Sequence, residues 1–181
     1  IGNPTACAVL PNGDCIWYEK ISNVWFRTTP AGVHSIYLVF RTPTTGITPI
    51  PAANPDFGTV LPAIPTDPFD RVAVDRQIGT VYLATNSSQT AGKNYVFRCV
   101  DVDNDGDVND PGEVTIFFDG VTSIPAWGPI DDIDWFNGSL YLSYEINPTA
   151  DPGSQFVQLR DLNADGDAMD AGELTSLGRT A

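Results

Sequence analysis

The sequence predicts an all-β protein whose antiparallel sheets recur in units of about 60 residues. Short runs rich in β-branched and aromatic residues occur along the chain, as in HSIYLVFR from His34 to Arg41. Segments 72–85 and 131–144 align with each other, and so do the two acidic segments 101–113 and 161–173. Four short strands in each unit, repeating with such a period, are typical of blade-like sheets.

The composition is that of a globular protein. Of the 181 residues, 42% are hydrophobic and 10% aromatic, which excludes a disordered chain and suffices for one domain or two small ones. No apolar run approaches the ~18 residues of a membrane-spanning helix, so we expect no membrane span.

The chain is strongly acidic, and much of the acidity is local. The formal net charge is -14, from 23 acidic and 9 basic residues, and eleven of the 23 acids lie in segments 101–113 and 161–173. Two bound Ca²⁺ ions would bring the charge to about -10. Nucleic acids and anionic membranes are unsuitable partners for such a surface.

Residues 1–41 are predicted to form a β-hairpin and a degenerate strand unit. The hairpin pairs residues 8–10 with residues 15–18 across the turn PNGD, because Asn-Gly is the strongest short hairpin signal. Strands are also expected at 24–27 and 34–41, which are rich in β-branched and aromatic residues. His34, the only histidine, begins the last of these, where we expect a surface or hydrogen-bonded role.

The cysteines favour an extracellular protein. Cys7 and Cys15 are close enough to form a disulfide across a short loop. Cys99 lies in the strand-like run YVFRCV, where a buried free thiol is expected and an intermolecular disulfide is the alternative. Only two lysines and a start at Ile1 without Met or signal segment also suggest a secreted, processed chain, or an excised one.

Residues 42–69 differ from the rest of the chain. They contain seven prolines in 28 residues, so they cannot form a helix or a central strand, and an extended polyproline II path is expected. We expect a linker between the N-terminal unit and the repeats, or an arm that packs on a neighbouring molecule.

The remaining chain is predicted to form two β units, 70–129 and 130–181. Each consists of strand, Gly turn, strand, variable loop, strand, acidic loop and short strand, the last strands being 114–118 and 174–177. Three residues recur 59 positions later: Asp75 as Asp134, Gly79 as Gly138 and Tyr82 as Tyr141. In the fainter unit before them, Tyr37 is expected to take the place of Tyr82.

Each acidic loop, DVDNDGDVNDPGE and DLNADGDAMDAGE, is predicted to bind one Ca²⁺. Oxygen ligands at alternate positions converge on one point when the backbone turns sharply at Gly106 or Gly166. An all-oxygen set fits calcium and disfavours zinc or copper. The expected ligands are Asp101, Asp103, Asp105, Asp107 (through its carbonyl or a water), Asp110 and Glu113, and in the second loop Asp161, Asn163, Asp165, Asp167, Asp170 and Glu173.

These loops resemble the EF-hand-like loops of dockerins and thrombospondin type 3 repeats, and more closely the DxDxDGDxxDxGE loops of secreted bacterial repeat proteins. The resemblance covers about 13 residues per copy and implies a metal site. An EF-hand has a bidentate Glu at position 12, where this chain has Gly112 and Gly172, with the Glu one place later. The late ligand is therefore either the tenth or the thirteenth residue of each loop.

Over roughly residues 70–181, the pattern xVxxDxxGxLYLxx resembles blades of the NHL and gluconolactonase-like secreted bacterial propellers. The resemblance implies blades with a calcium loop between their third and fourth strands. Closed propellers need ~4 to 8 blades, and this chain has at most three. It is therefore a fragment, a ring completed by oligomerisation, or an open sandwich or solenoid with covered edges. Open edges favour a homo-oligomer or polymer formed by strand addition.

We find no catalytic constellation and expect no enzyme. A His-based metal centre is excluded by the single histidine, and no GxSxG elbow, Gly-rich phosphate loop or CxxC motif is present. Asp131, Asp132 and Asp134 form an acidic cluster, but Asp134 matches Asp75 and indicates a turn. The tryptophans are expected mainly in the core, with a sugar-stacking surface as the alternative; they are Trp17, Trp25, Trp127 and Trp135.

The expected function is that of a secreted, non-enzymatic, calcium-stabilised structural or adhesive protein. One such protein would be the subunit of a self-assembling extracellular filament or surface layer, with contacts to the cell surface or to glycans. A fragment of a calcium-dependent propeller enzyme, resembling gluconolactonases or phytases, is an alternative, and a carbohydrate-binding module is another. Consecutive acids in local loops argue against the enzyme, because its calcium would lie at the ring centre.

Overall fold

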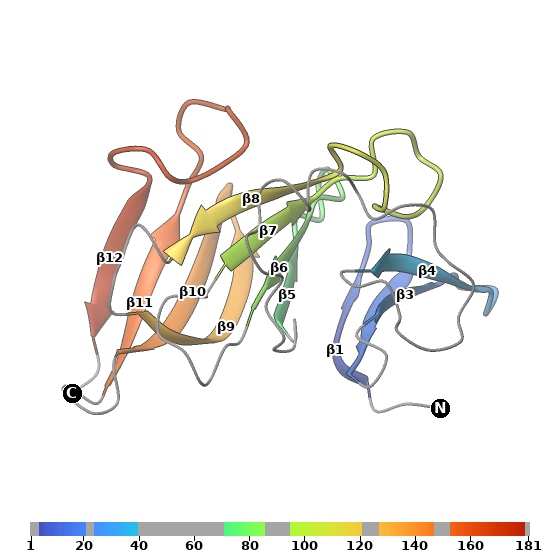
Figure 1. Ribbon diagram of the computed structural model, residues 1–181, viewed down its shortest axis with the longest axis horizontal. Helices are drawn as coiled ribbons and strands as arrows, with labels where there is room; N and C mark the ends of the chain where they lie inside the picture. The colour runs from blue at the N-terminus through green and yellow to red at the C-terminus, as the bar shows by residue number, and fades with distance from the viewer. Residues whose placement is uncertain are drawn as a thin grey trace.

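The computed structural model describes residues 4–20, 24–39, 71–85, 95–120, 127–146 and 153–179. These residues form three four-stranded antiparallel sheets, each with its strands in chain order and none closed on itself (Figure 1). The predicted all-β class is therefore confirmed. The proline-rich segment 42–69 lies outside the described residues.

The sheets follow one another along the chain. The N-terminal sheet contains β1 (Pro4–Val9), β2 (Cys15–Glu19), β3 (Val24–Thr28) and β4 (His34–Val39). The middle sheet contains β5 (Arg71–Val74), β6 (Val81–Ala84), β7 (Tyr95–Cys99) and β8 (Val114–Asp119). The C-terminal sheet contains β9 (Trp127–Phe136), β10 (Ser139–Ile146), β11 (Gly153–Leu159) and β12 (Leu174–Arg179).

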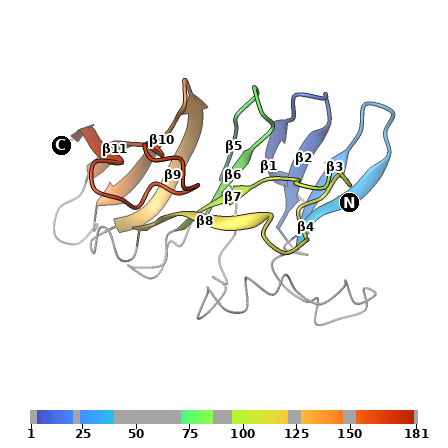
Figure 2. The same cartoon turned by 90° about the horizontal axis from the view of Figure 1, so that it is seen from above.

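The middle sheet is packed between the other two, which lie at opposite ends of the long axis (Figures 1 and 2). Its strand β6, VYLA, is buried at all four positions. Val81 and Leu83 face the N-terminal sheet, whereas Tyr82 and Ala84 face the C-terminal sheet. A strand buried on both faces needs apolar residues at every position, which explains why this run does not alternate with polar residues.

Two separate cores result from this arrangement. The first lies between the N-terminal and middle sheets and contains Ile16, Tyr18, Trp25, Leu38, Val81, Leu83 and Phe97. The second lies between the middle and C-terminal sheets and contains Tyr82, Val96, Phe118, Ile133, Leu140, Leu142 and Val157. The first strands β1, β5 and β9 contact one another in sequence, so the sheets approach most closely at that side.

Each fourth strand contains one β-bulge at the same place in its sheet. In the N-terminal sheet, Trp25 is opposite Leu38 and Phe26 is opposite Ile36, which leaves Tyr37 without a direct partner. The corresponding extra residues are Phe117 in β8 and Leu177 in β12. The alignment of Tyr37 with Tyr82 was therefore wrong. Tyr82 is in a second strand, opposite Arg98 of β7, where the N-terminal sheet has Ile16 opposite Arg27.

Cys7 and Cys15 do not form the disulfide that their spacing would allow, and both thiols are free. Cys7 is opposite Trp17, and Cys15 is opposite Val9, so the two cysteines are diagonal neighbours rather than direct partners across the hairpin. Cys99 is a buried free thiol, as predicted, and burial raises its pKa.

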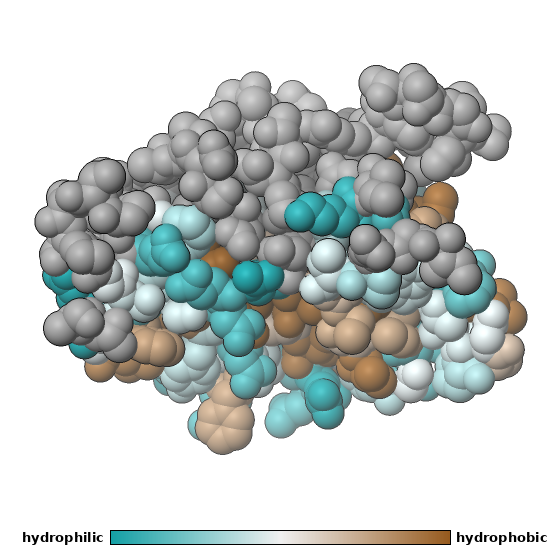
Figure 3. Space-filling view, turned by 90° about the horizontal axis from the view of Figure 1, so that it is seen from below, coloured by the Kyte–Doolittle hydropathy of each residue, from teal (hydrophilic) through white to brown (hydrophobic). Residues whose placement is uncertain are grey.

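Several large apolar side chains are exposed, among them Val33, Ile78 and Phe136. On the face shown in Figure 3, apolar side chains lie among hydrophilic ones. Among the described residues, no helix has the length and apolarity needed to cross a membrane.

Candidate metal centres in two equivalent loops

Loop 1 (residues 101–113) connects β7 to β8, and loop 2 (residues 161–173) connects β11 to β12. Each therefore lies between the third and fourth strands of its sheet, as predicted. Both project from the same side of the molecule (Figure 1).

The two loops share a set of equivalent internal hydrogen bonds. The Gly106 N–H donates to Asp101 Oδ2 at 3.0 Å, and the Gly166 N–H donates to Asp161 Oδ2 at 3.0 Å. The side chains at positions 3, 5 and 7 each accept an N–H from the residue two places later, at 2.9 to 3.2 Å. These short turns direct successive side-chain oxygens toward the inside of the loop.

The thirteenth residue closes each loop. Glu113 is buried, and its two carboxylate oxygens accept the N–H groups of Val102 at 2.8 Å and Asp110 at 3.2 Å. Glu173 accepts from Leu162 at 2.7 Å and Asp170 at 2.9 Å. Both oxygens of each Glu are thus bonded to the loop backbone, so each Glu holds its loop closed.

Loop 1 concentrates three carboxylates at one point. One ligand oxygen each from Asp101, Asp103 and Asp105 lies within 4.8 Å of the others. Asp101 Oδ1 is buried and has no hydrogen-bond partner. Partial desolvation, followed by the carboxylates of Asp103, Asp105 and Asp107, raises the pKa of Asp110. A buried unpartnered oxygen among repelling carboxylates is an environment that a hard cation would stabilise.

In loop 2, groups of the loop itself donate hydrogen bonds to several of its carboxylates. Asn163, in the place of Asp103, donates its amide to Asp165 Oδ2 at 2.9 Å and to Asp170 Oδ2 at 2.7 Å. Asp161 Oδ1 accepts the Ala164 N–H at 2.6 Å. Positions 3, 5 and 10 of this loop are thus in contact, which is the arrangement that a shared ligand would require.

Each loop is also bonded to the preceding sheet, a contact that cannot be read directly from the sequence. The N–H of Val108, the eighth residue of loop 1, donates to the Tyr37 carbonyl at 3.0 Å. In loop 2, the Ala168 N–H donates to the Phe117 carbonyl at 2.8 Å. Both acceptors are bulge residues, and both loop side chains are buried. The sequence feature that could have indicated this contact is the apolar residue at the eighth position of each acidic loop.

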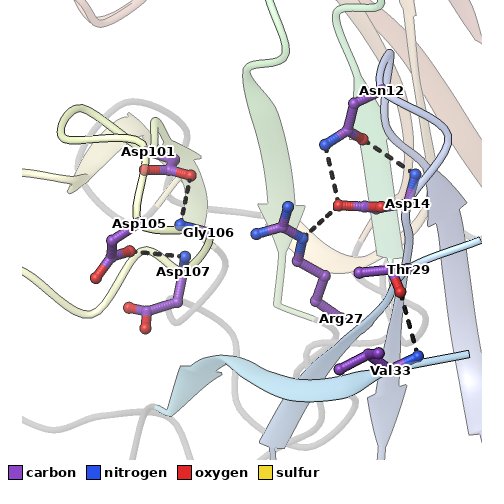
Figure 4. A network of polar contacts seen from close by, with 9 residues as sticks. All are labelled: Asn12, Asp14, Arg27, Thr29, Val33, Asp101, Asp105, Gly106 and Asp107. Carbon is purple, nitrogen blue, oxygen red and sulfur yellow. Dashed lines mark hydrogen bonds and ion pairs between the residues drawn. The ribbon is translucent and has the colours of Figure 1, made fainter. Parts of the chain in front are cut away.

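An arginine from the preceding sheet lies against the glycine turn of each loop. Arg27 bonds to the buried carboxylate of Asp14, and a Cβ built at Gly106 would overlap its guanidinium (Figure 4). Arg98 occupies the matching position next to loop 2, where a Cβ at Gly166 would lie 3.7 Å from its Nη1. Each loop therefore has a cation of the neighbouring sheet beside its glycine turn.

The candidate residues outside the two loops are hydrogen-bonded to nearby groups of the protein. Asp75 Oδ1 accepts the Gln77 N–H at 2.9 Å, and Asp134 Oδ1 accepts the Trp135 N–H at 2.9 Å, so both are bonded to nearby backbone. They line a groove of about 810 Å³ next to β1, β5 and β9. His34 Nδ1 is 2.8 Å from Thr28 Oγ1, in agreement with the hydrogen-bonded role predicted for it.

The tryptophans with described side chains belong largely to the packing of the sheets. Trp25 is fully buried, and Trp135 stacks on Tyr82 with ring centres 4.7 Å apart. Trp17 stacks on Phe26 at 4.8 Å. The side chain of Trp127 lies outside the described part of the structure.

Comparison with known proteins gives no family assignment: neither the protein-family models nor the curated proteins contain a match to this sequence.

Proposed function

We propose that this protein is an extracellular, non-enzymatic, calcium-stabilised structural protein, in which Ca²⁺ in each loop fixes one sheet to the preceding one. The observation that carries the proposal is the duplicated geometry. Two loops that share a set of equivalent internal hydrogen bonds each donate the N–H of their eighth residue to a bulge carbonyl of the neighbouring sheet.

The proposed calcium ligands are the residues at positions 1, 3, 5, 7 and 10 of each loop. Calcium takes six to eight oxygens at ~2.3–2.6 Å, so water would complete the shell. In loop 1 the cation would also satisfy the buried Asp101 Oδ1. Glu113 and Glu173 would hold the backbone of the loop in place rather than contribute ligands. The proposed ligands are Asp101, Asp103, Asp105, Asp107 and Asp110, and Asp161, Asn163, Asp165, Asp167 and Asp170.

Calcium binding would stabilise the contacts between sheets because the same loop performs both tasks. The eighth residue is inserted into the core between two sheets, where Val108 and Ala168 are buried. A cation that binds the folded loop and not the unfolded chain favours the folded state by mass action. The free energy of calcium binding would therefore stabilise the junction between the sheets as well as the loop.

The arrangement of the sheets supports an interpretation as blades of an open propeller-like array. Each sheet has its strands in chain order, and the first strands β1, β5 and β9 lie next to one another. The loops belong to the outer half of each sheet. Among the described residues, none of loop 1 or loop 2 lines the groove between the first strands, so the proposed calcium role is distinct from any ligand in that groove.

The test is a calcium titration by calorimetry, with thermal unfolding in calcium and in chelator. We expect two bound Ca²⁺ per chain and a higher Tm in calcium. Asp105→Ala and Asp165→Ala should each remove one site and part of the calcium-dependent rise in Tm. Asp132→Ala, which removes an acid of β9 outside the loops, is the matched control and should bind two ions. The proposal is wrong if the parent binds no calcium, or if its Tm is the same in both conditions.

A further inference from the structure

The C-terminal sheet presents an uncovered face that corresponds to a covered face of the middle sheet. Directly paired residues in antiparallel strands point to the same side of a sheet. Tyr82 and Arg98 are such a pair on the middle sheet, and Tyr141 and Gln158 are the corresponding pair on the C-terminal sheet. The bulge residue Leu177 corresponds in the same way to Phe117.

On the middle sheet, the C-terminal sheet and loop 2 pack on this face. Tyr82 stacks on Trp135 of the C-terminal sheet, and the Phe117 carbonyl accepts the N–H of Ala168. On the C-terminal sheet, the same face remains open, with Phe156 49% and Leu177 53% exposed. We call this open surface the C-terminal end face; it consists of Asp132, Tyr141, Ser143, Phe156, Gln158 and Leu177.

The N-terminal sheet has the complementary open surface. Trp17 and Phe26 are opposite each other, as Leu83 and Phe97 are on the middle sheet. Leu83 and Phe97 are buried against the preceding sheet, whereas Trp17 and Phe26 belong to neither core of the described residues. We call this surface the N-terminal end face; it consists of Cys7, Val9, Cys15, Trp17, Phe26 and Ile36. Val9 is 50% exposed, and Trp17 and Phe26 stack on each other.

We propose that copies of this chain stack head to tail, with the C-terminal end face of one copy packed on the N-terminal end face of the next. The two end faces are the two halves of a junction that the chain already makes twice within itself, so a second copy continues an existing interface. Such a heterologous contact leaves one open face at each end and extends into a filament or closes into a ring.

The junction between copies would be weaker than the two internal junctions. In the N-terminal sheet, β3 and β4 are joined by a short turn, in which the Thr29 N–H donates to the Val33 carbonyl. No loop is therefore available there to donate to the Leu177 carbonyl. We expect stacking to depend on protein concentration. This inference goes beyond the proposed calcium function, because neither end face contains a residue of loop 1 or loop 2.

The test is sedimentation velocity over a range of protein concentrations, in calcium and with a reductant that keeps Cys7 and Cys15 as thiols. The parent should form larger species as its concentration rises. Phe156→Glu blocks the C-terminal end face and Val9→Glu blocks the N-terminal end face, so each variant alone should associate at least about tenfold more weakly, because a charge would be buried in the contact. Ile78→Glu changes a residue that is 72% exposed and lies on neither face, and it should associate like the parent.

Mixing the two blocked variants gives the sharper result. Phe156→Glu retains an N-terminal end face and Val9→Glu retains a C-terminal end face, so an equimolar mixture should form a dimer with one copy of each and nothing larger. A parent that stays monomeric would overturn the proposal, and so would blocked variants that self-associate like the parent or a mixture that forms no dimer. Calorimetric calcium binding, measured on the same samples, shows independently whether the proposed calcium function holds.

Discussion

Loop 1 and loop 2 have nearly the same backbone but different surroundings. Both donate the N–H of their eighth residue to a bulge carbonyl of the preceding sheet. In loop 1, Asn109 adds two contacts to that sheet, since its amide donates to the Tyr37 carbonyl at 3.3 Å and its Oδ1 accepts the Val39 N–H at 3.0 Å. Loop 2 has the exposed Met169 at this position. The hydrogen bonds within a loop thus determine its shape, whereas its neighbours determine how firmly it is attached.

We expect the two loops to differ also in how much a bound cation would stabilise them. Loop 1 has a carboxylate at position 3, and its Asp101 Oδ1 is buried without a partner. In loop 2, the Asn163 amide bonds to Asp165 and Asp170 and so reduces the repulsion between them. Loop 2 can therefore retain its shape more easily without metal, while loop 1 should gain more from binding one.

The largest expected difference concerns the glycine turns. Gly106 and Gly166 both have positive φ, at 98° and 100°, so alanine is strained at either position. Only at Gly106 would the new Cβ also overlap an arginine, and Arg27 is held in place by Asp14. We expect Gly106→Ala to lower the free energy of unfolding by ~3 kcal/mol and Gly166→Ala by ~1–2 kcal/mol. Denaturant unfolding measures both, and equal losses would show that Arg27 moves freely.

The next difference is in calcium affinity. Asp103→Asn removes one negative charge from loop 1 and gives it the third residue of loop 2, so we expect its calcium Kd to rise by roughly tenfold, about 1.4 kcal/mol. Asn163→Asp is the reverse exchange and should strengthen binding at loop 2. Calorimetric titration of the two variants provides the check. The contrast between the loops is refuted if Asp103→Asn binds as tightly as the parent.

A smaller difference is expected from the ninth residue of each loop. Asn109→Ala removes the two hydrogen bonds to the N-terminal sheet and should lower the free energy of unfolding by ~1–2 kcal/mol. Met169→Ala is the matched change in loop 2 and should have an effect within ~0.5 kcal/mol, because the side chain is exposed. Chemical denaturation of both variants in calcium would reveal the difference. A larger loss for Met169→Ala would contradict it.

The smallest expected effect is at position 4 of the loops. Asn104 and Ala164 both have left-handed backbone conformations, with φ of 62° and 63°, and asparagine tolerates this conformation better than alanine. Ala164→Asn should therefore stabilise the protein by ~0.5 kcal/mol, and Asn104→Ala should destabilise it by a similar amount. Tm values of the two variants should shift in opposite directions. A shift in the same direction would mean that the side chains, and not the backbone, dominate at this position.

The sequence was sufficient for those features that depend on neighbouring residues. Strands such as VYLA of β6 follow from local composition, and the turns at Gly106 and Gly166 follow from the need for positive φ. The position of both loops after a third strand could also be predicted, because strands and turns alternate in a fixed order along the chain.

Features that depend on residues far apart in the chain could not be predicted. The alignment of Tyr37 with Tyr82 failed because Tyr37 lies in the fourth strand of its sheet and Tyr82 in the second, and the place of a strand in its sheet is visible only once the strands are paired. The part played by Glu113 was likewise ambiguous. A carboxylate that binds backbone N–H groups and one that binds metal have the same sequence pattern.

The sequence by itself determined the strands, the two acidic loops and the candidate ligands for a hard cation, since these depend on side-chain chemistry and local backbone geometry. Only the tertiary structure decided that Val108 and Ala168 attach each loop to the preceding sheet, and that Arg27 lies against Gly106. The reason is physical: Tyr37 and Val108 are distant in the chain, and only the packing of two sheets around one core brings them together.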